Sequence, residues 1–135
     1  MKRTKRLLSV FLTLCLLLGM LPTTARAANL IQISTLEQLE KFRDEVNSGS
    51  VDHSNDMIEL TADIDLGGSE ANQWTPIGTK SNPFKGIFDG GGHKITGLYI
   101  NTTNDYSCQG LFGYVGVGGT VSKLGIEGTV KGAGL

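Results

Sequence analysis

The stretch that decides the predicted fold is Lys94-Ile95-Thr96-Gly97-Leu98-Tyr99-Ile100. Its apolar residues Ile95, Leu98 and Ile100 recur 26 positions later as Val121, Leu124 and Ile126. A repeat of roughly 20 to 50 residues indicates stacked units that bury their apolar faces only against one another. Because equivalent strands are one whole repeat apart and are not joined by short hairpin turns, the pattern predicts parallel pairing.

The predicted fold class is therefore all-β, a right-handed parallel β-helix with an N-terminal α-helical cap. We expect its first two to three coils in residues 51–135. Alternation of apolar and polar residues predicts strands at 57–60, 63–66, 84–88, 94–100, 110–115 and 120–126. Gly134-Leu135 looks like the beginning of another unit, so we expect the sequence to be the amino-terminal part of a longer protein.

Residues 28–50 are predicted to form the N-terminal capping segment, with a helix at about residues 35–47. Ser34-Thr35 followed by Glu37-Gln38 forms a capping box, in which side chains satisfy the unpaired amides of a helix start. One apolar stripe follows at helical spacing, and its members are Leu36, Leu39, Phe42 and Val46. We expect this stripe to cover one end of the core.

Residues 1–27 are predicted to be a signal peptide. A basic start precedes the apolar run 7–18, and Ala25-Arg26-Ala27 fits a cleavage site that would leave Ala28 as the first mature residue. The apolar run is too short to span a bilayer as a helix. We therefore expect a secreted or cell-surface protein with no stable membrane span after cleavage; an uncleaved anchor and a lipoprotein acylated at Cys15 are the alternatives.

Removal of the signal peptide makes the chain acidic. Five of the 12 Lys and Arg residues lie within it, so seven basic and 13 acidic residues remain, a net charge of −6. This balance argues against a nucleic-acid partner, because phosphate binding depends on Lys and Arg contacts. Cys108 would then be the remaining cysteine, so no intrachain disulfide is expected, and we predict that its side chain is buried.

Residues 31–132 resemble bacterial surface proteins built of GLUG-type repeats. The resemblance rests on Gly110-Leu111-Phe112-Gly113, on Trp74-x-Pro76-Ile77-Gly78 and on the stretch from Phe84 to Ile100. It implies a parallel β-helix in an exported or wall-attached protein, often with adhesin-like or polymer-binding modules downstream and in some cases a peptidase domain. The resemblance supplies no catalytic residue. Further domains of the same polypeptide are the expected partners.

Several residues could carry chemistry, but their settings favour structural roles. Asp63 and Asp65 alternate with apolar residues, so they should point outward, and Asp89 precedes three glycines where Asp commonly closes a turn. We expect His93 to hydrogen-bond backbone at a corner and His53 to be solvated in its polar connector. Without a further histidine or a cysteine pair, no metal site, cofactor or catalytic residue is predicted.

Aromatic side chains suggest one binding function. Trp74, Tyr99 and Tyr106 are the candidates for contact with carbohydrate, because aromatic faces cover the C–H surfaces of sugars while polar edges stay wet. Packing over the core is the competing interpretation for Trp74. A polysaccharide or a host-surface polymer is accordingly the expected ligand class.

The sequence as a whole predicts an exported, non-catalytic scaffold or adhesion module of a bacterial surface protein. Two alternatives stay open, and both place the catalytic region beyond residue 135. The chain could be the N-terminal part of a β-helical polysaccharide-degrading enzyme, or the leading module of a surface peptidase.

Overall fold

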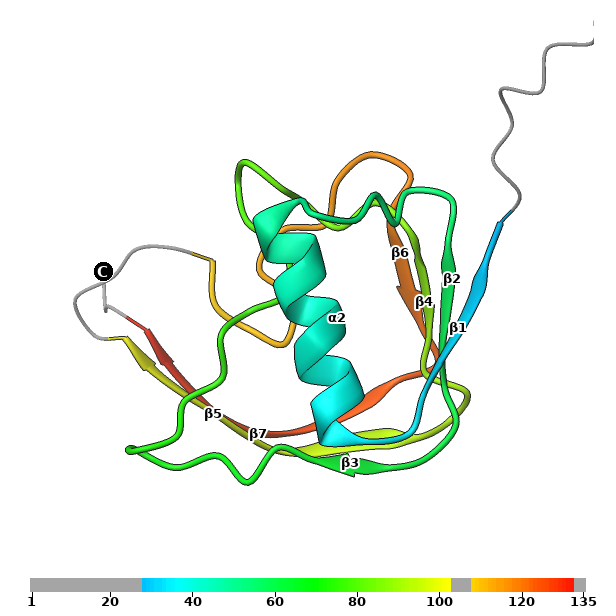
Figure 1. The fold of residues 1–135 in the computed structure, drawn as a ribbon. Coiled ribbons are helices and arrows are strands. Elements are labelled where there is room, and N and C mark those ends of the chain that lie inside the picture. Colours follow the sequence, from blue (N-terminus) through cyan, green and yellow to red (C-terminus); the bar gives the residue numbers. More distant parts are fainter. Residues whose placement is uncertain (1–27, 103–107, 133–135) are drawn as a thin grey trace, which may run out of the picture.

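The structure is a computed structural model that describes residues 28–102 and 108–132 (Figure 1). Seven strands form two sheets. The first has the order β1 (Leu30–Ile33), β2 (Met57–Leu60), β4 (Ile87–Asp89), β6 (Thr120–Ser122), and the second β3 (Ile64–Asp65), β5 (Lys94–Thr102), β7 (Gly125–Gly132). Every pairing between these strands is parallel. The helix α2 (Leu36–Ser48) lies in front of the two sheets in the view of Figure 1.

The predicted class, an all-β right-handed parallel β-helix, is wrong. In the described ranges the chain forms a mixed α and β structure of two parallel sheets and one helix. The helix is not an addition to an all-β body, because its side chains Leu39, Phe42 and Val46 belong to the same buried cluster as the strand residues. The sequence pattern located the helix but did not show that the sheets need it to complete their core.

The 26-residue offset is also wrong as a strand register. Ile126 lies opposite Ile95, 31 positions earlier, and Val121 lies opposite Phe88, 33 positions earlier. Ile95 and Val121, which the offset equates, belong to different sheets. The real spacing varies because the connections between strands differ in length, so a search for one fixed interval finds a coincidence.

Predicted strands agree with the structure where alternation is strong. The prediction for 57–60 is confirmed by β2, and that for 94–100 falls within β5. Segment 110–115 forms only isolated parallel bridges, Ile77 with Phe112 and Phe84 with Val115. Strand β1 lies inside the predicted capping segment and was missed, because its four residues are too few to show a period.

Helix α2 begins and ends where its capping residues predict. The Oγ1 of Thr35 accepts a hydrogen bond from the Gln38 amide at 3.3 Å, and the Gln38 side chain accepts one from the Ser34 amide at 2.9 Å. Gly49 ends the helix with φ of 69° and donates to the Val46 carbonyl. The capping box therefore fixes the start, and a left-handed glycine fixes the end.

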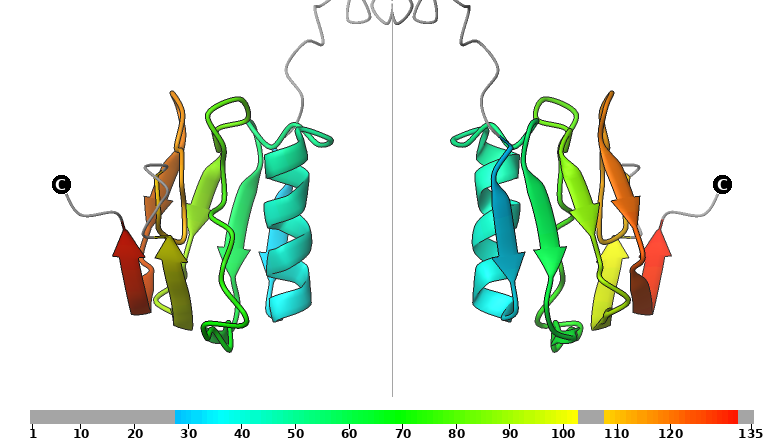
Figure 2. Two further views of the ribbon diagram at one scale, coloured as in Figure 1. Left: turned by 90° about the vertical axis from the view of Figure 1, so that its left-hand side faces the viewer. Right: turned by 90° about the vertical axis from the view of Figure 1, so that its right-hand side faces the viewer.

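The strands stack in layers between two unlike ends. Figure 2 shows α2 at one end of the stacked strands and β6 and β7 at the other. Between these ends, four phenylalanine rings pack against one another with centroid separations of 5.2 to 6.1 Å. One ring comes from α2, one from β4 and two from connecting segments. These rings are Phe42, Phe84, Phe88 and Phe112. Three of them belong to the buried core and Phe112 packs against it.

Candidate functional site

The three aspartates that the sequence singled out each hold a backbone amide. Each Oδ1 accepts one hydrogen bond of 2.8 or 2.9 Å, and the pairs are Asp65 with Gly67, Asp89 with Gly91 and Asp63 with Lys94. Gly67 and Gly91 have φ of 59° and 60°, so these two aspartates close turns through left-handed glycines. These carboxylates therefore have the structural roles that their positions in the sequence predict.

Asp63 also organises a small exposed group of charges. Its hydrogen bond from the Lys94 backbone N–H, together with a weaker contribution from His93, holds the pKa of the Asp63 carboxyl below its usual value. The Lys94 ammonium lies 3.0 Å from Glu127 Oε1, and this contact raises the pKa of Lys94. His93 contacts the Asp63 side chain at 3.2 Å, so the corner histidine bonds a carboxylate where a backbone partner was predicted.

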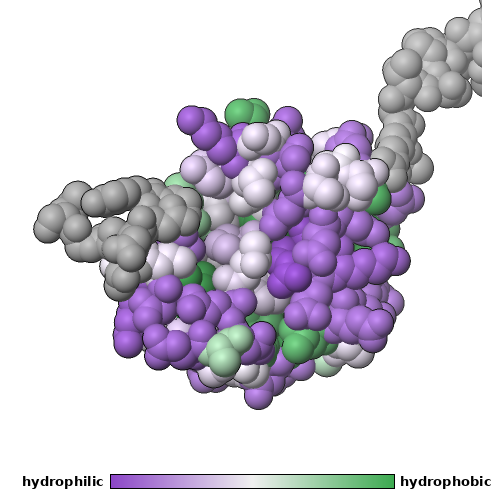
Figure 3. All heavy atoms as spheres, turned by 60° about the vertical axis from the view of Figure 1, so that its left-hand side comes forward, coloured by the Kyte–Doolittle hydropathy of each residue, from purple (hydrophilic) through white to green (hydrophobic). Residues whose placement is uncertain are grey.

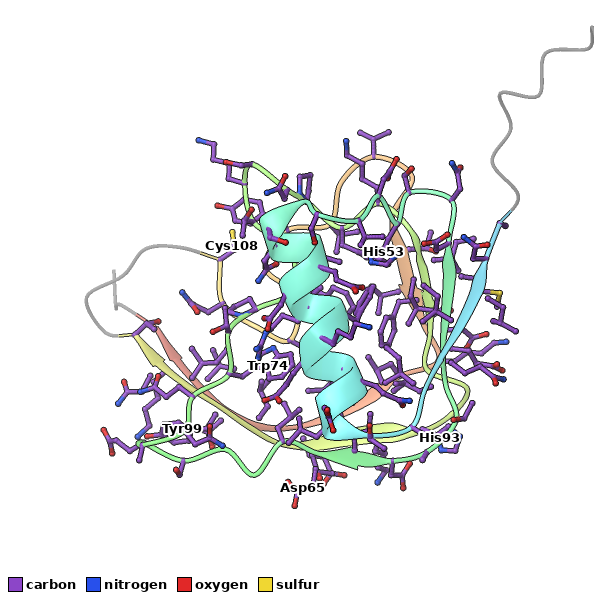
Figure 4. The ribbon with its side chains drawn as sticks, in the orientation of Figure 1. His53, Asp65, Trp74, His93, Tyr99 and Cys108 are labelled. Atoms are coloured by element: carbon purple, nitrogen blue, oxygen red, sulfur yellow. The ribbon has the colours of Figure 1, made fainter. Side chains whose placement is uncertain are left out.

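The candidate side chains do not converge on one site. Figure 4 shows them spread around the described structure, and those it labels are His53, Asp65, Trp74, His93, Tyr99 and Cys108. Over residues 28–102 and 108–132, no group of three or more His, Cys, Asp or Glu side chains could hold a metal ion. Asp63, Asp65 and Asp89 are therefore distributed among separate turns of the described residues.

One polar cluster is buried, and the sequence did not predict it. His53 and Asp56 are 6% and 2% exposed, so the expectation that His53 is solvated is wrong. His53 Nδ1 lies 2.8 Å from Asp56 Oδ2, and Asn29 donates to the other oxygen of Asp56 at 3.1 Å. The Phe42 ring meets the imidazole edge-on at 5.1 Å. The connector before β2 is thus anchored in the core by polar residues. Its sequence is as polar as that of a surface loop, which is why burial was not predicted.

The second imidazole nitrogen of His53 faces helix α2. Nε2 lies 3.3 Å from Glu45 Oε2, within ion-pair range, yet it makes no hydrogen bond to any described residue and is closed to solvent. A hollow of about 180 Å³ lies beside this cluster and is lined by Val46, His53, Phe84 and Lys85 among others. Because Nε2 is closed off, the cluster fastens α2 to the connector and does not present the imidazole to a ligand.

Trp74 is packed into the core. The side chain is 7% exposed, its Nε1 donates to the Leu111 carbonyl at 3.1 Å, and the Arg43 guanidinium lies over the ring at 4.7 Å from its centre. The packing role that competed with sugar contact is therefore well supported by geometry. Arg43 comes from α2, and no pattern in the sequence indicates that it covers the indole.

The other two aromatic candidates do not join Trp74. Tyr99 lies between Leu98 and Ile100, which are buried, so it points away from the core, whereas Trp74 points into it (Figure 4). Tyr106 lies outside the described residues. Contact with carbohydrate through these residues remains a prediction.

A groove of about 540 Å³ borders Trp74. Its walls include Gln73, Pro76, Lys80 and Tyr114. Asn47, from the end of α2, also lines it and is already bonded on both sides of its amide, to the Pro76 carbonyl at 2.9 Å and from the Gly78 N–H at 2.7 Å. Figure 3 shows a largely hydrophilic face with small, separate hydrophobic spots.

The repeat motif Gly110-Leu111-Phe112-Gly113 is a packing element. Leu111 is 2% exposed, and its carbonyl accepts from the Ile77 amide at 2.9 Å. The Gly113 amide donates in turn to the Ile77 carbonyl at 2.8 Å. The motif therefore lies directly beside Pro76-Ile77-Gly78, the other quoted segment. A Cβ on Gly113 would lie 2.8 Å from the Gly78 carbonyl oxygen, which explains why a small residue is needed there.

Two further expectations concern single residues. Cys108 is exposed, so the prediction that it is buried is wrong. The proposed cleavage point falls between Ala27, which is outside the described residues, and Ala28, which is exposed at the start of the described chain. The signal peptide itself, residues 1–27, also lies outside the described ranges and remains a prediction.

The fold and these contacts define a class: a mixed α and β structure whose polar side chains mostly hold its own backbone. The chain is similar to the "Putative Gly-rich membrane protein" of Evansella cellulosilytica, with 39% identity over 104 residues. That match covers 75% of this chain but only 12% of the relative. No protein-family model matches the chain, and no solved structure matches it.

The relative's name describes it as a membrane protein. In residues 28–102 and 108–132, no helix has the length and apolar character that a membrane crossing requires. The relative's name does not mention GLUG-type repeats, so the resemblance to that family stays a prediction.

Proposed function

We propose that this chain is a non-catalytic structural module of an exported bacterial surface protein. The observation that carries the proposal is the use of its polar residues: Asp63, Asp65 and Asp89 hold backbone amides at separate turns. His53 and Asp56 anchor a connector and are closed to solvent. Catalysis requires an acid, base or nucleophile within reach of one substrate position, and these residues serve separate turns.

The proposal includes display outside the cell and contact with polysaccharide or a host polymer. Display rests on the signal-like segment 1–27 and on the resemblance to GLUG-type surface proteins. Contact with carbohydrate would use the groove beside Trp74, where Tyr114 and Lys80 lie. The alternatives of a polysaccharide-degrading enzyme and of a surface peptidase place their catalytic residues outside this sequence.

Export is tested by expressing the full chain with a C-terminal epitope in a bacterial host. We expect the epitope to be accessible to protease outside the cell, and mass spectrometry to find Ala28 as the first residue. Leu16→Arg should abolish export because it interrupts the apolar run, and Leu16→Val should not. Retention of the intact chain from Met1 in the cytoplasm would contradict the proposal.

A further inference from the structure

The end of the molecule formed by β6 and β7 leaves inward-facing apolar side chains uncovered. We call Val121, Ile126 and Val130 the end row. They lie opposite Phe88, Ile95 and Ile100 respectively in the parallel ladders. The three earlier residues are at most 1% exposed, whereas those of the end row are 39%, 46% and 46% exposed. The end row continues the core, and no further layer of described residues covers it.

The opposite end of the same core is covered. Leu39, Phe42 and Val46 of α2 lie over it and are 0%, 3% and 6% exposed. Figure 2 shows this asymmetry as a helix at one end of the strands and bare strands at the other. Burial of apolar side chains is the main favourable term in folding, so an end row left in water is a surface suited to a partner.

The backbone at this end is equally suited to an added strand. Among the described residues, β6 pairs only with β4 and β7 only with β5. The outer sides of β6 and β7 therefore carry N–H and C=O groups that can pair with another strand. Neither strand contains proline, which would remove a backbone donor from the edge. The charged side chains of β7, Glu127 and Lys131, alternate with the end row and so point away from the core, which leaves the inward-facing row apolar.

We propose that the β6–β7 end binds a further pair of parallel strands, supplied by a continuation of the same polypeptide, with apolar residues in register with the end row. This inference rests on the proposed structural function and names the partner of the module. The established ladders support this occupant, because β6 was added to β4 and β7 to β5 in the same parallel manner. The relative is consistent with this occupant, because the match covers only 12% of that protein.

The test adds one layer and measures protection of the end row. In the full chain carrying Cys15→Ser and Cys108→Ser, residues 103–132 are repeated once after Gly132, and Ile126→Cys is made in the first copy alone. We expect the rate of thiol labelling at position 126 to fall at least tenfold relative to the chain without the repeat. Val130→Cys provides a second position should the first variant fold poorly.

Two matched controls accompany the measurement. In one, Val121→Ser, Ile126→Ser and Val130→Ser are made in the repeated copy alone, and the thiol in the first copy should label rapidly again. In the other, Val117→Cys in the first copy reports a residue that is 97% exposed and should label rapidly in every chain.

Two outcomes would overturn the inference. Equal labelling with the apolar and the serine repeat would show that no layer adds in register. Slow labelling in the chain without a repeat, accompanied by a dimer in light scattering, would show that a second copy occupies this end. Neither outcome changes the export measurement, so the two proposals fail separately.

Discussion

Asp56 Oδ2 lies 2.8 Å from His53 Nδ1, and both side chains are buried where the connector between α2 and β2 meets the core. A buried carboxylate is costly unless its oxygens are paired, and here Asn29 and His53 satisfy one oxygen each. His53 also reaches Glu45 of α2. This cluster therefore joins the strand β2 region to the helix through polar contacts inside an apolar setting.

His53→Ala should lower the free energy of unfolding by about 3 kcal/mol, because it leaves Asp56 with an unpaired buried oxygen and opens a cavity beside Phe42. The measurement is urea unfolding followed by circular dichroism. His93→Ala is the matched control, since His93 also contacts an aspartate but at the surface, and it should cause only a small fraction of that loss. Equal losses in the two variants would show that the buried cluster adds nothing specific.

Gly78→Ala should destabilise the protein more than Gly92→Ala. Both glycines have positive φ, 87° and 78°, so each substitution carries a backbone penalty of about 1–2 kcal/mol. A Cβ at Gly78 would also collide with the Tyr114 carbonyl oxygen, whereas Gly92 has open space, and this overpacking adds about 1–3 kcal/mol. Melting temperatures of the two variants check the difference, and identical values would refute the close approach of these segments.

Asp63→Asn should make the stability of the folded protein depend less on pH in the acidic range. The pKa of Asp63 is lowered in the folded protein, chiefly by the Lys94 amide, so the unfolded chain binds its proton first as the pH falls. The stabilising contribution is complete above the unfolded pKa of about 4 and is lost as the pH falls through the folded pKa. Melting temperatures between about pH 6 and pH 2.5 should fall less steeply in the variant, and parallel curves would contradict this assignment.

Local features of this fold were readable from the sequence because their causes are local. The capping box at Thr35 and the glycine at position 49 act within a few residues, and α2 begins at the first and ends at the second as predicted. Asp89 before its glycines closes a turn for the same reason. Such motifs carry their own hydrogen-bond partners, so neighbouring residues suffice to recognise them.

Long-range features were not readable, because they depend on connection lengths. The pairing of Ile95 with Ile126 depends on the number of residues in the connections between the strands. A fixed interval of 26 residues therefore predicted the wrong partner. His53 and Cys108 were both misjudged, since burial depends on what other segments bring to them. The Arg43 guanidinium over Trp74 joins positions 31 residues apart and leaves no pattern in either segment.

The contact between Arg43 and Trp74 also gives the protein a built-in optical reporter. Trp74 is the single tryptophan of the chain, and it lies at the junction between the helix and the second sheet. Its emission spectrum therefore reports on one specific boundary, free of contributions from other indoles. Detachment of the helix would admit water to the ring and shift the emission to longer wavelength, so an intact sheet with a loosened helix could be distinguished from global unfolding.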